Sequence, residues 1–381
     1  MTKPYHLREV RPALFSSSLA TRLACLLVAA CFLTPQLLLG GTIKTIAGTG
    51  QAANNGSGGP ATKINVGSPF GVEIGPDKNL YITEVGNHRI LRLEFDTGKL
   101  TTVVGTGQQG YSGDGGPASA ANLNEPYEVR FDSVGNMYFV EMKNHIVRWV
   151  EKKTGKIRTI AGTGTAGFSG DGGPAIKAQL KSPHSIALDD RQGLYVADIG
   201  NHRIRRIDLQ TGTITTIAGN EKVQLPQDGQ RAEGNPIRGP RALYYRDQTL
   251  WIALREGHSV WRLDLTSGTL HHVAGSGIKG FAGDNGAPEK AQFNGPKGIA
   301  LGPQGNVYVV DTENQAIRKI DLRNKRITTV AGQGPSHRGG KGDNGPATQA
   351  ELARPHGICV SSRGEIIIGD TLNHRVRIIK P

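Results

Sequence analysis

Residues 183–219 read PHSIALDDRQGLYVADIGNHRIRRIDLQTGTITTIAG, and this stretch decides the fold. It contains four short runs rich in β-branched and apolar residues, at 183–188, 193–198, 203–208 and 213–219. Turn-forming residues separate the runs, and the last two alternate apolar and polar side chains, as strands with one buried face do. The stretch therefore predicts one unit of four β-strands.

An acidic residue placed three positions before an asparagine marks this unit and recurs along the chain. The markers stand at positions 84, 141, 198, 254, 311 and 370, so the differences are 57, 57, 56, 57 and 59. The copy at position 254 is degenerate, because leucine replaces the acid. Four strands repeated at such a regular period are the signature of a β-propeller, with one unit per blade.

The phase of the repeat predicts the number of blades and how the ring closes. A proline opens the first strand of each unit, and a glycine ends the fourth strand, six times each. The repeated part begins with a fourth strand at 42–48 and ends with a third strand at 375–380. We therefore predict an all-β, six-bladed propeller over residues 42–381, with four strands per blade. Residues 42–48 should complete the last blade and so leave no open sheet edge.

These markers resemble those of the NHL-repeat family, which is named after an Asn-His-Leu trio, although the third letter here is usually arginine. The resemblance covers residues 42–381 and implies the six-bladed propeller fold. Known members include protein-binding and RNA-binding modules, sensor domains of membrane kinases and a peptidylglycine lyase; related propellers include lactonases. The resemblance is therefore specific for fold and not for function.

Residues 1–41 differ from the repeats and predict an export segment. Basic residues precede an apolar run at 23–39, which is typical of a signal peptide. The sequence VAAC at 28–31 resembles a bacterial lipobox, in which Cys31 would be lipidated. Simple cleavage near residue 40 and retention as an uncleaved anchor are the alternatives. We expect a periplasmic, cell-envelope or secreted protein, with a lipid anchor to the membrane if Cys31 is modified.

The composition narrows the class of partner. The formal net charge is +13, which favours anionic partners such as phosphate, acidic glycans or lipid headgroups. No run of lysine and arginine of the nucleic-acid-binding type occurs, so no nucleic acid partner is expected. Cys359 is the one cysteine after the export segment, which excludes an internal disulfide and a cysteine-based metal site there. A closed ring has no need to pair with itself, and we expect a monomer.

Two sets of repeated acidic residues are candidates for sites. The marker recurs once per blade, with an acid in five of the six copies, whereas chemistry needs one asymmetric site, so we expect the marker acids to tie turns to the backbone by hydrogen bonds. A second set lies in loops of the type Gly-Asp-(Gly/Asn)-Gly. Each loop offers a single carboxylate, which favours an Asp-Gly turn over a calcium site. The loop residues are Asp114, Asp171, Asp284 and Asp343.

The residue after the first-strand proline varies from blade to blade, with histidine alone occurring twice, and should lie at one mouth of the central channel. A position that varies on a constant framework is a natural place for binding. Aromatic and basic side chains would suit an anionic or sugar-like ligand, although some of them could instead pack between blades. The predicted ligand-binding residues, called the mouth residues below, are Phe70, Tyr127, His184, Arg241, Lys297 and His356.

The alternative function is a metal-dependent enzyme of the peptidylglycine-lyase or lactonase type, holding zinc or calcium in the channel. The segment around His184 resembles the one that supplies a zinc-binding histidine in the lyase. Only His356 could join His184, and they lie across the ring from each other, so a zinc site is disfavoured. Glu73 and Glu128 are the remaining metal candidates. The sequence thus favours a non-catalytic module without a cofactor, which binds a protein, a peptide or an anionic glycan.

Overall fold

The computed structural model describes residues 41–189 and 191–381. The predicted export segment and the lipidation site at Cys31 lie outside the described residues. Within the described ranges, no helix has the length and apolar character needed to cross a membrane.

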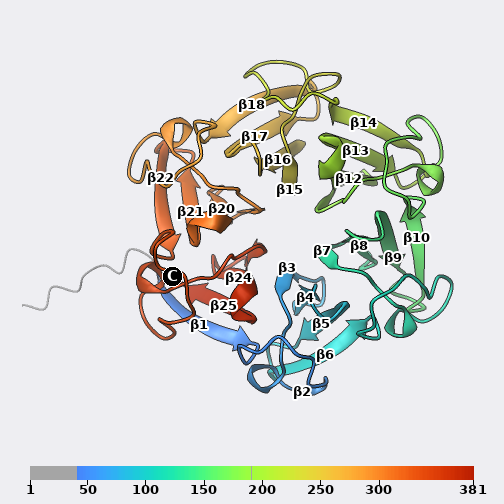
Figure 1. Ribbon diagram of the computed structural model, residues 1–381, viewed down its shortest axis with the longest axis horizontal. Coiled ribbons are helices and arrows are strands. Elements are labelled where there is room, and N and C mark those ends of the chain that lie inside the picture. The colour runs from blue at the N-terminus through green and yellow to red at the C-terminus, as the bar shows by residue number, and fades with distance from the viewer. Residues whose placement is uncertain (1–40, 190) are drawn as a thin grey trace, which may run out of the picture. The chain divides into compact units, whose positions relative to one another are not determined.

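The described chain forms a ring of six antiparallel sheets, one sheet per blade (Figure 1). This confirms the predicted fold class. Blade 1 also holds a fifth, two-residue strand, β2, which pairs with β6 and was not predicted. The strands are β3(Pro69–Ile74), β4(Leu80–Glu84), β5(Arg89–Leu93), β6(Lys99–Val104) and β2(Gly59–Pro60) in blade 1; β7(Pro126–Phe131), β8(Met137–Glu141), β9(Ile146–Val150) and β10(Ile157–Ala161) in blade 2; β11(Ile186–Leu188), β12(Gly193–Asp198), β13(Arg203–Asp208) and β14(Ile214–Gly219) in blade 3; β15(Pro240–Arg246), β16(Thr249–Leu254), β17(Ser259–Asp264) and β18(Thr269–Ala274) in blade 4; β19(Gly298–Leu301), β20(Val307–Asp311), β21(Ala316–Asp321) and β22(Arg326–Ala331) in blade 5; and β23(Ile358–Val360), β24(Ile366–Asp370), β25(Arg375–Lys380) and β1(Thr42–Ala47) in blade 6.

The ring closes through β1, as the phase of the repeat predicted. β1 pairs antiparallel with β25, with Ile43 opposite Ile379, so strands from both ends of the repeated region share one sheet (Figure 1). The side chain of Ile43 is fully buried. The ladder satisfies the backbone groups of β25 that would otherwise form an open edge.

A long crossover loop joins each fourth strand to the next blade. The glycine that ends the fourth strand turns the chain with a positive φ, which is 92° at Gly219, and a Cβ there would lie 2.1 Å from the His202 carbonyl oxygen. Only glycine fits such a position. Short 3-10 turns lie in the crossover loops and after the second strands: η1(Ala61–Lys63), η2(Ala118–Ala120), η3(Ala175–Lys177), η4(Ile199–Asn201), η5(Pro288–Lys290), η6(Thr312–Asn314), η7(Ala347–Gln349) and η8(Thr371–Asn373).

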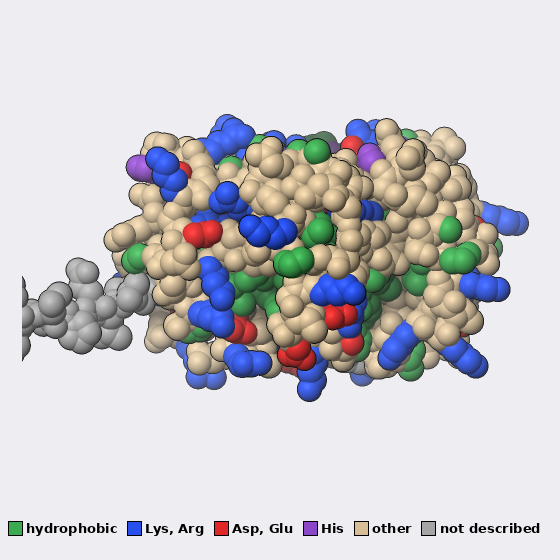
Figure 2. All heavy atoms as spheres, turned by 90° about the horizontal axis from the view of Figure 1, so that it is seen from below, with side chains coloured by type: hydrophobic (Ala, Val, Ile, Leu, Met, Phe, Trp, Pro, Cys, Tyr) green, Lys and Arg blue, Asp and Glu red, His purple; other side chains and the backbone are tan. Residues whose placement is uncertain are grey.

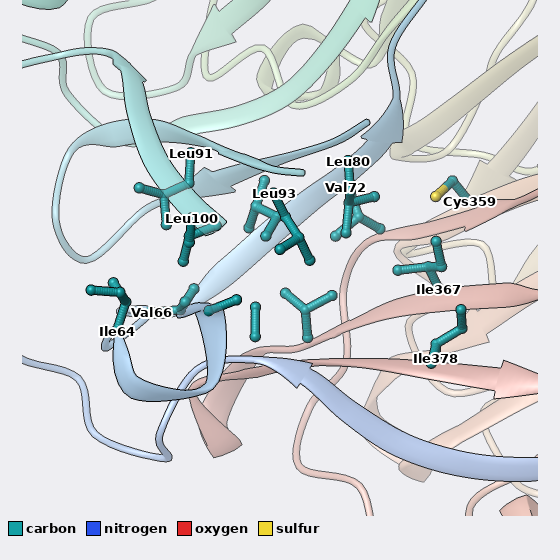
Figure 3. Packing of buried hydrophobic residues seen from close by; sticks show 14 residues of the cluster. Ile64, Val66, Val72, Leu80, Leu91, Leu93, Leu100, Cys359, Ile367 and Ile378 are labelled. Atoms are coloured by element: carbon teal, nitrogen blue, oxygen red, sulfur yellow. The ribbon is translucent and has the colours of Figure 1, made fainter. Parts of the chain in front are cut away.

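The hydrophobic core lies between neighbouring blades. Figure 3 shows one such cluster, in which Val72 and Leu80 of blade 1 lie near Ile367 and Ile378 of blade 6. Burying an aliphatic side chain of this size stabilises the fold by about 1.5–3 kcal/mol. Because each cluster contains side chains of two blades, a single blade cannot bury its apolar side chains alone and depends on its neighbour for stability.

A histidine latch also joins each blade to the next. The histidine of the Asn-His marker has a left-handed backbone conformation, and its Nδ1 accepts a hydrogen bond from a backbone N–H just before the next blade. His374 accepts from Ser68 at 3.1 Å, which links blade 6 to blade 1. In blade 5, the Gln315 side-chain oxygen replaces Nδ1 and accepts from the Arg354 N–H at 2.6 Å. The other latches are His88, His145, His202 and His258.

The latch predicts an acid-sensitive ring. Burial lowers the pKa of His374 below its usual value of 6.5 in the folded protein. Below about pH 6.5 the unfolded chain therefore takes up the proton more readily, and the latch loses stability as the pH falls. His374→Gln should match the wild type within about 1 kcal/mol at about pH 8, because glutamine can accept the same hydrogen bond. At about pH 5 the variant should be the more stable protein in urea unfolding.

The matched control is Gln315→His, which should add acid sensitivity. Buried carboxylates also titrate in this range, so the informative quantity is the difference between variant and wild type at each pH. Parallel stability curves for all three proteins would contradict the latch.

Candidate functional site

The marker carboxylates stand at the ends of the second strands and are fully buried. In blade 3, Asp198 accepts hydrogen bonds from the Lys181 backbone N–H and the Asn201 side chain, each at 2.7 Å. Asn201 also donates to the Gly167 carbonyl oxygen in the crossover loop at 2.7 Å. Glu141, Asp311 and Asp370 repeat these contacts. The expectation that the marker acids tie turns to the backbone is confirmed.

A buried arginine joins each marker acid to the crossover loop. Arg205 lies 3.6 Å from the Asp198 carboxylate and 2.6 Å from that of the loop residue Asp171. We call this set of two carboxylates and one arginine the clamp. The arginine is fully buried in each of the four complete clamps. The other three are Glu141–Arg148–Asp114, Asp311–Arg318–Asp284 and Asp370–Arg377–Asp343.

The clamp explains the Gly-Asp loops that were weighed as turns or calcium sites. Each loop aspartate neutralises a buried guanidinium and is already engaged by it. Burial raises the pKa of Asp198 to about 6 and that of Asp311 to about 7, and the arginine and amide donors oppose this rise. Sequence analysis missed the arginines, although each one follows its loop aspartate by 34 residues in all four blades.

Blades 1 and 4 depart from the clamp. In blade 1, Leu91 and Ser57 occupy the arginine and loop positions, and Arg89 pairs with Glu84 instead. In blade 4, Leu254 and Trp261 replace the acid and the arginine. Trp261 packs against the His272 ring at 4.8 Å, so an aromatic contact takes the place of the ion pair.

The structure brings the mouth residues together at the start of the innermost strands. Phe70 stacks on Tyr127, with ring centroids 4.5 Å apart, and on His356 at 4.0 Å. His184 lies against Tyr127 at 4.8 Å. Phe70 is half-buried, and the other five mouth residues are buried. These side chains therefore pack against one another across blades, and their role in binding stays a prediction.

Burial and neighbouring positive charges disfavour the protonated forms of His184 and His356. Burial and the Arg241 charge hold the pKa of His184 well below its usual value, and burial with the Lys297 charge does the same for His356. Nδ1 of His184 donates to the Ser182 carbonyl oxygen at 2.6 Å. Because Phe70 and Tyr127 lie between the two histidines, the rings do not converge on one point, as zinc ligands must.

The basic mouth residues differ in how they are paired. Lys297 donates to Glu313 at 2.7 Å, and burial lowers its pKa to about 8. Arg241 lies over the Tyr127 ring, with Cζ 5.4 Å from the centroid, and burial lowers its pKa to about 10.

The candidate metal ligands Glu73 and Glu128 are engaged by one arginine. Arg130 lies 3.4 Å from the Glu73 carboxylate and 3.1 Å from that of Glu128, and Ser185 donates to Glu128 at 2.7 Å. A cation between the carboxylates would have to displace the guanidinium, so these residues do not fit a metal. Across residues 41–189 and 191–381, no group of three or more His, Cys, Asp or Glu is arranged to hold a metal ion.

Three exposed aromatic residues on the crossover loops were missed from the sequence. Tyr111, Phe168 and Phe281 are 49%, 41% and 36% exposed. Each covers a clamp arginine, with Cζ 4.9 to 5.3 Å from the ring centroid. We call them the rim aromatics. The signal was the aromatic letter three positions before Asp114, Asp171 and Asp284.

Basic side chains are spread over the surface. Figure 2 shows Lys and Arg on many parts of one side of the molecule, with Asp and Glu among them. The net charge of +13 is thus not confined to one patch on that side.

Comparison with known proteins agrees with this architecture. The family model described as NHL repeat matches residues 180–207, 293–320 and 352–379, and each match contains a marker and its following strand. These matches show that the chain carries NHL repeats, as its markers predicted. It is 29% identical over 283 residues to NHL repeat-containing protein 2 of Gallus gallus, covering 67% of this chain and 38% of the relative. It is 26% identical over 318 residues to Protein SUPPRESSOR OF QUENCHING 1, chloroplastic, of Arabidopsis thaliana, covering 80% and 29%.

This NHL-repeat protein therefore spans only about a third of the length of these curated relatives. Among solved structures, it is similar to an auxiliary nutrient binding protein from Bacteroides thetaiotaomicron. The TM-score is 0.65 at 18% identity, over 89% of this chain and 76% of that one. At this identity the likeness shows the fold alone.

The clamp predicts strong coupling between its members. Arg205→Leu should destabilise the protein by about 3–5 kcal/mol, because it leaves buried carboxylates without their counter-ion. Asp198→Leu together with Arg205→Leu should cost less than the sum of the single substitutions, with a coupling of about 1–3 kcal/mol in urea unfolding. The surface pair Arg206 and Asp208 is the control and should couple by less than about 1 kcal/mol. Equal coupling in both pairs would rule out a special role for the clamp.

The pairing of Glu73 and Glu128 with Arg130 predicts a metal-free channel. Elemental analysis of the purified protein, kept free of chelators and histidine tags, should find zinc and calcium far below one equivalent. One equivalent that survives gel filtration and disappears in Glu128→Gln would restore the metal-enzyme alternative.

Proposed function

We propose that this chain is an exported, non-catalytic binding module that recognises a protein, a peptide or an anionic glycan through its loop-bearing rim and channel mouth. The NHL propeller supplies a rigid ring, so binding at its rim loses little conformational entropy. The description of a similarly folded solved protein as nutrient-binding agrees with such a role.

The proposal rests on one observation: the contacts that hold the blades together repeat around the ring, whereas the mouth residues vary. The clamp recurs in four blades and a latch at every blade junction, whereas the mouth position holds Phe, Tyr, His, Arg, Lys and His. The constant contacts are explained by folding. The side chains that vary on this framework are left to determine what binds.

The rim aromatics support the same surface. Phe168 is held by Arg203, with Cζ 3.8 Å from its ring centroid, and remains 41% exposed. An aromatic ring fixed by a cation on one side offers apolar contact area at low entropic cost. Aromatic side chains beside arginines suit both acidic peptides and anionic glycans.

Export, lipidation at Cys31, the monomeric state and the absence of a cofactor are parts of this proposal that come from the sequence. Anchoring at the cell surface by a lipid would present the ring to partners outside the cytoplasm. Mass spectrometry of the mature chain would identify the processed residue.

Binding should depend on the rim aromatics. Phe168→Ala should weaken binding to arrayed acidic peptides or anionic glycans at least about tenfold, because an aromatic residue at a binding hot spot contributes about 2 kcal/mol or more. Phe95→Ala is the matched control, because Phe95 is 42% exposed but lies at the turn between β5 and β6, at the opposite end of the strands.

Affinity that falls equally in both variants, or in neither, would contradict recognition at the rim. Melting temperatures of both variants should stay close to that of the wild type, which separates lost binding from lost folding.

A further inference from the structure

We propose that the channel mouth binds a small monocarboxylate through the guanidinium of Arg241. This inference rests on the proposed function and names the ligand chemistry of one part of the site. It is carried by Arg241 itself, because its Nη1 is buried in the mouth without a hydrogen-bond partner among the described residues.

Arg241 is 3% exposed, and its Nη1 is shielded from solvent. No side chain or carbonyl of the described residues lies within hydrogen-bonding distance of Nη1. Buried guanidinium groups elsewhere in this ring have acidic partners, as the clamps show. An unpartnered buried charge is strongly destabilising, so it needs an explanation in a ring that otherwise satisfies its ions.

Each of the carboxylates near Arg241 has another arginine within ion-pair distance. Glu128 pairs with Arg130 at 3.1 Å, and Glu256 pairs with Arg255 at 3.2 Å. Lys297, the next basic mouth residue, pairs with Glu313. Among the described residues, Arg241 is therefore the basic mouth residue whose buried Nη1 has no acceptor, and an occupant with one carboxylate would supply it.

The geometry favours a carboxylate of small size. The planar guanidinium fork matches the two oxygens of a carboxylate. Because Arg241 is nearly sealed, only a small group can reach it. The Tyr127 ring lies on one side of the guanidinium and supplies an apolar wall. Burial holds the pKa of His184 and of His356 well below its usual value, which disfavours a second cation beside Arg241.

One competing explanation is a water molecule. Oε2 of Glu256 is likewise buried and without a partner, so a water bridging Glu256 and Arg241 would satisfy both groups. The two explanations predict opposite effects of removing the arginine. If a water bridges the two groups, removal of the arginine leaves Glu256 without a partner and destabilises the fold. If an exchangeable carboxylate is the partner, removal of the arginine eliminates an unpaired buried charge from the ligand-free protein and does not destabilise it.

The test is thermal unfolding of the full chain in sodium acetate, sodium benzoate and sodium chloride at matched ionic strength. The melting temperature of the wild type should rise with acetate and benzoate, because a ligand that binds only the folded state stabilises it. Arg241→Met should abolish this rise and, without carboxylate, unfold at the same or a higher temperature than the wild type. Arg206→Met, on the outer part of blade 3, should keep the full response.

A carboxylate response that persists in Arg241→Met would overturn the proposal, and so would an equal response to chloride. A lower melting temperature of Arg241→Met with no carboxylate response in the wild type would identify the water bridge. If Arg241→Met does not fold, acetate titration of the wild type, followed at the Arg241 Nε–H by NMR, answers the same question: an unchanged signal overturns the proposal. Loss of this site with intact Phe168-dependent binding would leave the proposed function standing.

Discussion

In the four blades with a complete clamp, a guanidinium between two carboxylates ties the strands of the blade to its crossover loop. Taking an arginine such as Arg205 out of water is costly, and the cost is offset only when acids on both sides and nearby carbonyl oxygens receive its hydrogen bonds. The same contacts fix the glycine-rich loop, which has no regular structure beyond a short 3-10 turn. In the four clamped blades the loop is thereby tied to the strands beneath it, and Phe168 packs on the clamp arginine Arg205.

The number of blades and the closure could be predicted because they follow from counting. A repeat that starts with a fourth strand and ends with a third leaves one solution for an edge-free ring, and β1 takes that place beside β25. The mouth residues could be located for the same reason, since they follow a proline in each unit. Their burial could not, because the backbone next to that proline is irregular, with register shifts in β3, β7 and β15.

The clamp and the latch were missed for a different reason. Arg205 lies in an alternating strand, where a charged letter normally indicates the solvent face. Its partner Asp171 lies in a loop of another part of the repeat, so only the fixed separation of the two letters carries the signal. The latch depends on a left-handed backbone at the histidine, which a single sequence does not reveal. The unpaired state of Arg241 depends on what its neighbours bind, and pattern alone cannot show it.

The latch has a consequence for how such rings arise. Each blade offers a side-chain acceptor to the blade after it and receives one from the blade before it, so every junction joins unlike halves in the same direction. A blade duplicated in frame would therefore carry both the acceptor and the donor that its new junctions need. After deletion of a blade, the acceptor of the preceding blade would still meet a donor before the following one. Because every junction is of this head-to-tail kind, the number of blades can change in evolution. The main limit is that the angles between neighbouring blades must still add up to a closed ring.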